Sequence, residues 1–390
     1  MRTHLLAGVV ALFPVSAMAE PVIWTGDVNL RGFDCLKEHR DGIIVRGPVT
    51  LVHPDDSQSN GSIEEIVVAC TGLTFDPGSQ ISSISSLDIR IDGTSTGTIK
   101  LVNTRGIDGV DAPPTPDIWK AMKMANGASR GGAPDGRDAS GCAGIDDKSS
   151  KSGADGARGE DGQSGLLHAA SPGANGKGGG TAGDIYFVSR FLAPGATVEV
   201  SANGGNGGIG GLGGRGADGG DGGNGGTGGQ GGDANSCHNA DHGGNGGNGG
   251  NGGDGGNGGQ GGNGGDGGNG GNVVVAVQEG AAAISPKIVN RGGAGGAPGN
   301  GGDPGIGGKK GFGASGGWGG GGDGGIFGTG LSSKEPGKGG LGGANGVDGK
   351  DGERGPMGVW GKDGQNGHIG DGFTGTLPKA GMDRLVKNGS

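Results

Sequence analysis

Short apolar runs alternate with turn residues in the first part of the chain. The runs are rich in Val, Ile and Leu, and Gly, Pro, Asp and Asn lie between them; they fall at residues 22–24, 43–45, 49–52, 66–69, 87–91 and 98–102. Such alternation is typical of short strands joined by tight turns. It predicts an all-β N-terminal domain over residues 20–108, with a β-helix and a β-sandwich as the two alternatives.

The same plan returns further along the chain. An apolar strand, a turn, a second apolar strand, an Asn and a Gly-rich exit occur at residues 87–109, 183–208 and 271–296, with a degenerate copy at 370–389. The spacing is roughly 90 residues, as in repeat architectures. We therefore expect pairs of β-strands at regular intervals, separated by three Gly-rich excursions.

The central excursion has a period of three instead. Residues 203–232 and 242–271 each hold ten triplets, most of them Gly-Gly-X, on either side of the stretch 233–241. Three residues per turn is the repeat of the extended polyproline-II-type helix, and Gly at two of three positions leaves two faces of bare backbone. The period predicts polyglycine-II helices that pair their open N–H and C=O groups with neighbouring chains.

The other two excursions, about 110–182 and 297–369, have sparser Gly and a turn-like stretch near the middle. Three hairpins of two arms predict a bundle of about six polyglycine-II helices, joined by β-strand pairs, with little or no α-helix. Ten triplets would extend roughly 90 Å at ~3.1 Å per residue. Because an enclosed helix needs two Gly faces and an edge helix only one, the central hairpin is expected in the interior.

The composition is consistent with Gly-rich excursions that are ordered but lack a hydrophobic core. Gly accounts for 110 of 390 residues and aromatic residues for 3%. A loose, disordered array is the alternative to a packed one, since Gly-rich chains without a period are usually disordered. The formal net charge of -10 argues against nucleic-acid and anionic-membrane partners.

The first 19 residues resemble a secretory signal peptide. They contain Arg2, an apolar stretch from Leu5 to Val15 and a small-residue cleavage site before Glu20. No later segment is apolar enough to cross a membrane. We expect an exported bacterial protein of the cell envelope or the medium. Its chain is divided into a signal peptide (1–19), a β-rich domain (20–108), a Gly-rich bundle (109–370) and a C-terminal strand segment (371–390).

Four cysteines in an exported chain favour two disulfides, for which three connectivities exist. Cys35 and Cys70 share the N-terminal domain, whereas Cys142 and Cys237 each lie near the middle of a Gly-rich excursion. This placement favours the pairs Cys35–Cys70 and Cys142–Cys237, the second joining the tips of two hairpins.

No pattern points to catalysis, a metal or a cofactor. GxGxxG recurs only as a consequence of the Gly content, and the Asp-Gly stretches lack the apolar residue that calcium-binding repeats require. Cys237, His238, Asp241 and His242 are close in sequence, as metal ligands can be, but a disulfide in a polar turn is the favoured explanation. We expect no catalytic residues, no metal and no cofactor.

The triplet runs resemble those of polyglycine-II bundle proteins, such as the snow flea antifreeze protein and the receptor-binding adhesins of phage tail fibres. Residues 346–367 are also similar to collagen-like sequence. The resemblance to adhesins implies binding through the loops that join the helices, around residues 140–152, 234–241 and 330–336. The candidate binding residues there are Asp146, Asp147, Lys148, Asn235, His238, Asn239, Lys334 and Glu335.

These observations predict a non-enzymatic structural or adhesin-like protein whose rigid bundle displays loops to a cell-surface or matrix component. Two alternatives stay open. One is a matrix or surface-layer protein without a specific ligand, and the other is an ice-binding protein.

Overall fold

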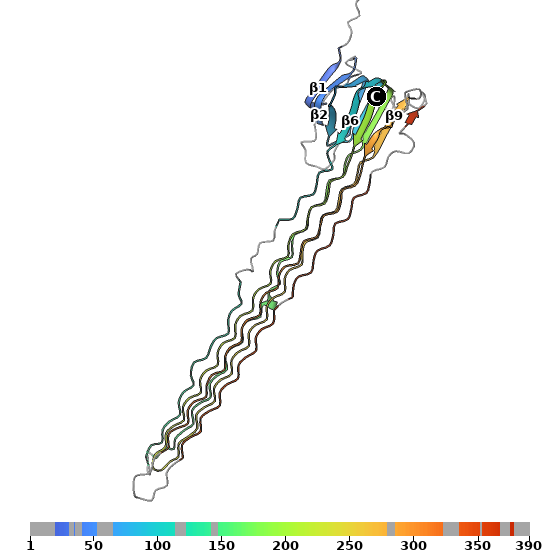
Figure 1. Cartoon of the computed structure of the whole chain (residues 1–390). Coiled ribbons are helices and arrows are strands. Elements are labelled where there is room, and N and C mark those ends of the chain that lie inside the picture. The colour runs from blue at the N-terminus through green and yellow to red at the C-terminus, as the bar shows by residue number, and fades with distance from the viewer. Residues whose placement is uncertain are drawn as a thin grey trace, which may run out of the picture.

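The molecule consists of a β-sheet at one end and a long stalk of Gly-rich segments that leads away from it (Figure 1). This is a computed structural model, and it describes residues 20–30, 35, 41–52, 65–113, 122–141, 147–278, 285–322, 335–351, 353–366 and 375–377. The predicted signal peptide, residues 1–19, lies outside the described residues.

Eleven strands form one sheet. They are β1 (Val22–Asn29), β2 (Ile43–Val52), β3 (Ile66–Phe75), β4 (Gln80–Ser83), β5 (Leu87–Thr96), β6 (Thr98–Asn103), β7 (Ile185–Leu192), β8 (Thr197–Ser201), β9 (Val273–Gln278), β10 (Lys287–Val289) and β11 (Gly375–Leu377). The helical structure in the described chain is limited to one 3-10 turn, η1 (Gly165–Leu167), in the stalk.

All pairings in the sheet are parallel. The order is β10-β8-β6-β4-β2-β3-β5-β7-β9-β11, with β1 beside β2. Even-numbered strands thus form one arm and odd-numbered strands the other. Strand β2 belongs to both, because its first half pairs with β3 and its second half with β4. From β3 onward the chain adds one strand to each arm in turn, and the sheet is nearly closed, like a barrel.

The hydrophobic core fills the space between the two arms. Successive side chains of a strand point to opposite faces, so every second residue turns inward. The fully enclosed side chains come from both arms and include Ile81, Leu87, Ile89, Ile91, Ile99, Leu101, Ile185 and Phe187. Burial of each such side chain contributes about 1.5–3 kcal/mol, which makes this core the main apolar stabilisation of the molecule.

Six extended segments form the stalk, and they run alternately away from the sheet and back to it (Figure 1). We number them in chain order, by their described residues: segment 1 (105–113 and 122–139), segment 2 (148–182), segment 3 (203–234), segment 4 (241–271), segment 5 (291–322) and segment 6 (337–351 and 353–366). Segments 1, 3 and 5 run parallel to one another, as do segments 2, 4 and 6. The collagen-like stretch lies in segment 6.

Backbone hydrogen bonds between segments recur every third residue. In the triplet 204–206, Gly204 donates to segment 5 and Gly205 to segment 2, both at 2.9 Å, while the Asn206 N–H donates to the Asp108 carboxylate at 2.7 Å. All three N–H groups of the triplet are therefore paired. Segments 3 and 4 each bond to four neighbours, in agreement with the interior position expected from their double glycines.

The predicted fold class is nevertheless wrong. The strands near residues 185–201 and 273–289 are not pairs that link a separate N-terminal β-unit to a helix bundle. They extend one parallel sheet, and the stalk residues are extended segments without polyglycine-II helix. The two strands of each repeat copy lie in different arms, and each pairs with the equivalent strand of the next copy. Each copy has the same alternation of apolar residues. When equivalent strands of successive copies pair in register, their apolar side chains form one continuous core, whereas the two strands of a single copy could not bury theirs alone.

Candidate functional site

The distal end of the stalk, furthest from the sheet, gathers most of the residues expected to bind. We call residues 140–141, 147–152 and 234–241 the tip. Of the candidates, Asp147, Lys148, Asn235, His238 and Asn239 lie in the tip, and Glu335 is exposed just before segment 6. Asp146 and Lys334 lie outside the described residues.

Contacts between two hairpins hold the tip. The His238 ring Nε2 pairs with the Asp147 carboxylate, and Ser150 Oγ donates to the Asn239 carbonyl at 2.6 Å. Lys148 pairs its backbone with Ser140 in an antiparallel bridge, at 2.8 and 2.9 Å. The structure thus brings residues from segments 1–2 and 3–4 together.

Asn235 shapes the turn between segments 3 and 4. Its Oδ1 accepts hydrogen bonds from the backbone N–H groups of Cys237 at 3.0 Å and His238 at 2.8 Å. Its Nδ2 donates to the Gly141 carbonyl at 2.9 Å. A single amide therefore fixes the turn and ties it to the neighbouring hairpin, as Asn side chains commonly do in turns.

Cys35 and Cys70 form a disulfide with their Cα atoms 5.1 Å apart, which confirms that predicted pair. Cys237 is also in a disulfide. Cys142 lies outside the described residues, so the pairing Cys142–Cys237 stays a prediction. The bond from Asn235 to Gly141 brings the chains around both cysteines together.

The tip chemistry is polar and suited to binding. Among the described residues, no group of three or more His, Cys, Asp or Glu side chains is arranged to hold a metal ion. The two tip side chains that could transfer a proton, His238 and Asp147, are hydrogen-bonded to each other. The arrangement offers exposed donors and acceptors on a fixed scaffold.

Rows of Asn and Asp along the stalk are structural residues that the sequence analysis did not identify. Their Oδ1 atoms accept from backbone N–H groups of the next parallel segment at 2.6–3.0 Å. We call these rows the Asx ladders. Those facing segments 5 and 6 comprise Asn203, Asn206, Asp218, Asp221, Asn224, Asp233, Asn245, Asn248, Asn251, Asp254, Asn257, Asn263, Asp266 and Asn269. The preference for Asn and Asp over longer polar residues at X was the available signal.

A cluster of ionisable groups lies on the odd-numbered arm where the sheet meets the stalk. Arg90 Nη2 donates to the buried Asp88 at 2.5 Å. Burial, and then the neighbouring Asp88 charge, raise the pKa of the Glu65 carboxyl. Burial, and then the Asp184 charge, raise the pKa of the Tyr186 hydroxyl. The Asp88–Arg90 pair explains the cluster as structural, because a buried carboxylate requires such a partner.

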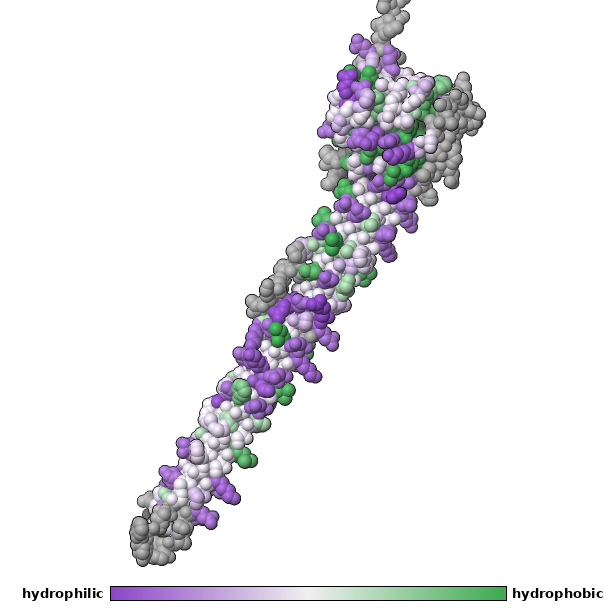
Figure 2. Space-filling model, viewed as in Figure 1, coloured by the Kyte–Doolittle hydropathy of each residue, from purple (hydrophilic) through white to green (hydrophobic). Residues whose placement is uncertain are grey.

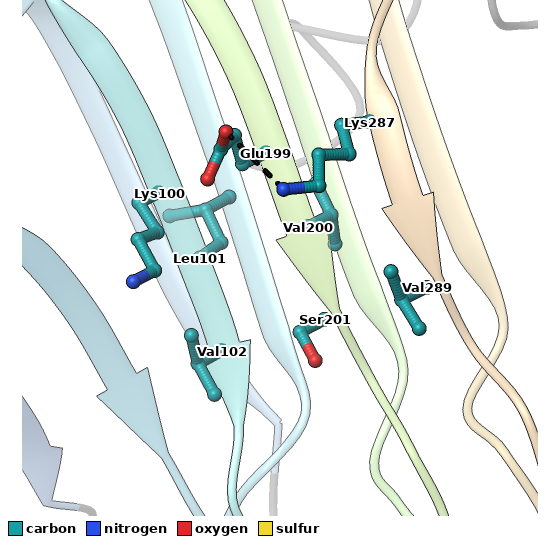
Figure 3. A pocket seen from close by; sticks show the side chains of 8 residues that line it. All are labelled: Lys100, Leu101, Val102, Glu199, Val200, Ser201, Lys287 and Val289. Atoms are coloured by element: carbon teal, nitrogen blue, oxygen red, sulfur yellow. Dashed lines mark ion pairs between the residues drawn. The ribbon is translucent and has the colours of Figure 1, made fainter.

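A shallow groove of about 240 Å³ crosses the outer face of β6, β8 and β10 (Figure 3). Its charged side chains alternate across the strands, with Glu199 between Lys100 and Lys287, and Lys287 Nζ lies 3.7 Å from the Glu199 carboxylate. Val102, Ser201 and Val289 follow in the next row (Figure 3). Opposite charges on neighbouring strands stabilise the sheet, and this explains the groove without a ligand.

Comparisons with known proteins give little. No protein-family model and no curated protein matches the chain. Among solved structures, the chain is similar to a springtail antifreeze protein from Granisotoma rainieri, described as a nine polyproline type II helical bundle. The identity is 26% over 51% of this chain and 92% of that chain, with a TM-score of 0.09. A likeness at this TM-score supports no conclusion, so the resemblance to polyglycine-II bundle proteins is not confirmed.

A search for membrane-spanning elements also gave a negative result. None of the helical structure in the described residues is long and apolar enough to traverse a bilayer.

Proposed function

We propose that the chain is a non-enzymatic, exported, adhesin-like protein whose stalk presents the tip to a cell-surface or matrix component. The observation that carries this proposal is the cross-bonded tip. His238–Asp147, Ser150–Asn239 and Asn235–Gly141 fix two hairpin ends to each other at the point furthest from the sheet.

The stalk supports the same proposal. Its segments are bonded to each other along their whole described length, at distances mostly between 2.7 and 3.0 Å. A segment of this kind cannot bend alone without breaking bonds to its neighbours. The tip is thereby held at a fixed distance from the sheet, and a preorganised surface loses less entropy on binding than a mobile one.

The disulfide Cys35–Cys70 supports export, because such bonds persist mainly in oxidising compartments. The net charge of -10 disfavours polyanionic partners such as nucleic acids. We therefore place the protein in the cell envelope or outside the cell, with a protein or polysaccharide surface as its partner and no cofactor.

The test measures binding of the full chain to immobilised peptidoglycan, lipopolysaccharide, collagen and fibronectin. We expect saturable binding to at least one of these, weakened about tenfold or more by the double variant Asp147→Ala/His238→Ala. The matched control is Asp303→Ala, which removes an exposed ion pair with Arg354 on the stalk. Binding to none of the four surfaces, or equal weakening by tip and control variants, would overturn the proposal.

A further inference from the structure

Two exposed aromatic side chains lie on one row of segment 5, near the tip. Phe312 is 61% exposed and Trp318 79% exposed. Figure 2 shows such isolated hydrophobic residues along an otherwise polar or glycine surface. Both aromatic side chains therefore have large apolar surfaces in water, although aromatic residues are rare in this chain.

The side chains of these two residues provide no acceptor for the backbone of a neighbouring segment. Row positions of segments 1–4 hold many Asn and Asp residues because a further parallel segment needs their oxygen acceptors. Segment 5 is the last of its parallel set, so the side chains of its row serve no such segment. Neither packing nor backbone pairing requires Phe or Trp here, so both rings are available to contact a ligand.

Neutral polar residues lie beside the two aromatic rings. The Phe312 N–H donates to Asn224 Oδ1 at 2.9 Å, which sets the register between segments 5 and 3. Three and six residues further on, Thr227 lies level with Ser315 and Gln230 with Trp318, as the donors Gly228 and Gly231 show. We call these six residues the aromatic strip: Asn224, Thr227, Gln230, Phe312, Ser315 and Trp318.

The aromatic strip carries no ionisable group, in a chain of net charge -10. Charged residues border it, with Asp221 and Lys309 at one end, Asp233 at the other, and the ion pair Lys310–Asp348 beside Phe312. These neighbouring charges are of both signs and largely offset each other, whereas a polyanion is repelled by the molecule as a whole.

Sugar rings match this surface. Their C–H faces stack on aromatic rings, which present a negative π-face to the weakly positive hydrogens, and their hydroxyl groups bond to amide and hydroxyl side chains. Phe312 and Trp318 are six residues apart, or roughly 20 Å along an extended chain. Only a linear polymer several sugars long reaches both rings.

We infer that the aromatic strip binds a neutral, linear polysaccharide laid along the stalk. The site is on the flank of the stalk and separate from the tip. Phe312 and Trp318 stack on sugar rings at its two ends, while Asn224, Thr227, Ser315 and Gln230 bond to hydroxyl groups between them.

Affinity electrophoresis of the full chain in native gels tests this inference. The gels contain laminarin, hydroxyethyl cellulose, galactomannan or dextran as neutral polymers, or alginate as a polyanion. We expect at least one neutral polymer, and not alginate, to retard the protein. The double variant Phe312→Ala/Trp318→Ala should weaken that binding about tenfold or more, while its thermal unfolding midpoint stays that of the natural chain.

Trp360→Ala is the matched control, since Trp360 is an equally exposed Trp, at 66%, on segment 6 outside the aromatic strip. Its polysaccharide binding should equal that of the natural chain. The tip variant Asp147→Ala/His238→Ala should also keep it, which separates this inference from the proposed function. Retardation by none of the neutral polymers, by alginate equally, or equal losses in the strip and control variants would overturn it.

Discussion

Backbone groups of the stalk are satisfied residue by residue, because the segments have almost no core. Two N–H groups of each Gly-Gly-X triplet donate to carbonyl oxygens of other segments, and the third donates to an Asn or Asp side chain in many triplets. A buried N–H without a partner costs about 1–3 kcal/mol. The identity of single residues, Gly at two positions and Asn or Asp at the third, therefore decides whether a triplet is stable in the stalk.

The first residue-scale prediction concerns Gly249, in the part of segment 4 nearer the tip. A Cβ atom there would overlap the Gly311 carbonyl, far inside the 3.0 Å limit that real contacts respect. Such overpacking costs about 1–3 kcal/mol, so Gly249→Ala should lower the unfolding temperature measured by calorimetry. Gly342→Ala is the control, because a Cβ there meets only the Ala314 carbonyl, at 3.8 Å. Equal effects at the two glycines would contradict the close approach of segments 4 and 5.

The second concerns pH. The hydrogen bond from Lys123, at 2.6 Å, and then that from the Lys309 backbone, at 2.8 Å, lower the pKa of Asp221 below its ordinary value of 3.8. A carboxyl whose folded pKa is depressed stabilises the fold above its unfolded pKa, and this stability is lost as pH falls through the folded pKa. Asp221→Asn keeps the Oδ1 acceptor but not the charge. Its stability deficit should be present at neutral pH, shrink as the pH falls below 3.8, and vanish once the pH is below the lower pKa of the folded state.

Calorimetry across this pH range measures the deficit directly. Asn224→Ala serves as the comparison, because Asn224 accepts the Phe312 N–H at 2.9 Å without titrating. Its deficit should be independent of pH. An Asp221→Asn deficit that stays constant down to the lowest pH would rule out the charged partner as its cause.

At the scale of elements, the sequence indicated where strands lie better than how they pair. Apolar alternation identified the strands now seen as β5 to β10, because one face of each strand is buried. The parallel pairing of β5 with β7 and β7 with β9 joins residues about 90 positions apart, and alternation does not specify a partner. The sequence similarity between the repeat copies was the one signal for this pairing. From the sequence alone, each copy was interpreted instead as a self-contained pair of strands.

For the candidate site, turn chemistry at Asn235 and the position of Cys237 pointed correctly to a hairpin end. The contact of His238 with Asp147 could not be read from the sequence, because it depends on the two hairpins ending at the same height. The Asx ladders could not be predicted from the sequence either, because each Asn or Asp bonds to the next parallel segment and the sequence does not show which segment that is.

The residues of both segment 5 and segment 6 fit the register in which these two segments pair. Asp363, Asp351, Asp348 and Asn345 of segment 6 accept N–H groups of segment 5 at 2.8–3.0 Å. In the same register Trp360 and Arg354 lie opposite Pro298 and Pro304, which have no N–H to donate. Side-chain acceptors are thus missing opposite both prolines.

This register predicts a stabilising change. Gly342 lies opposite Gly316, three residues beyond the pair Asn345–Gly313, and the Gly316 N–H has no hydrogen bond to any described residue. Gly342→Asn should supply an acceptor and stabilise the stalk by about 0.5–1.5 kcal/mol over Gly342→Ala. Trp360→Asn should give no such gain over Trp360→Ala, since it faces Pro298. Calorimetric midpoints of the four variants test the register, and equal gains at both sites would refute it.

For the whole molecule, stability of the stalk depends on contacts between residues far apart in the chain. Every described hairpin bonds to another hairpin along its length, so opening one breaks bonds in its neighbours. The sheet closes one end of this structure through its core. The described residues of the other end form no apolar core, and there the covalent link at Cys237 becomes important.

The last prediction is the disulfide Cys142–Cys237. The pair Cys35–Cys70 occupies the other two of four cysteines, and Cys237 is itself in a disulfide. The bond from Asn235 to Gly141 brings the two regions into contact. A crosslink closing a loop of this length stabilises by about 4–5 kcal/mol in the chain-entropy model, and it would act where the segments otherwise separate most easily. Peptide mapping without reductant should yield a Cys142–Cys237 peptide, and Cys142→Ser should lower the unfolding temperature. A free Cys142 thiol, or an intermolecular Cys237 link, would show that the tip is held by its hydrogen bonds alone.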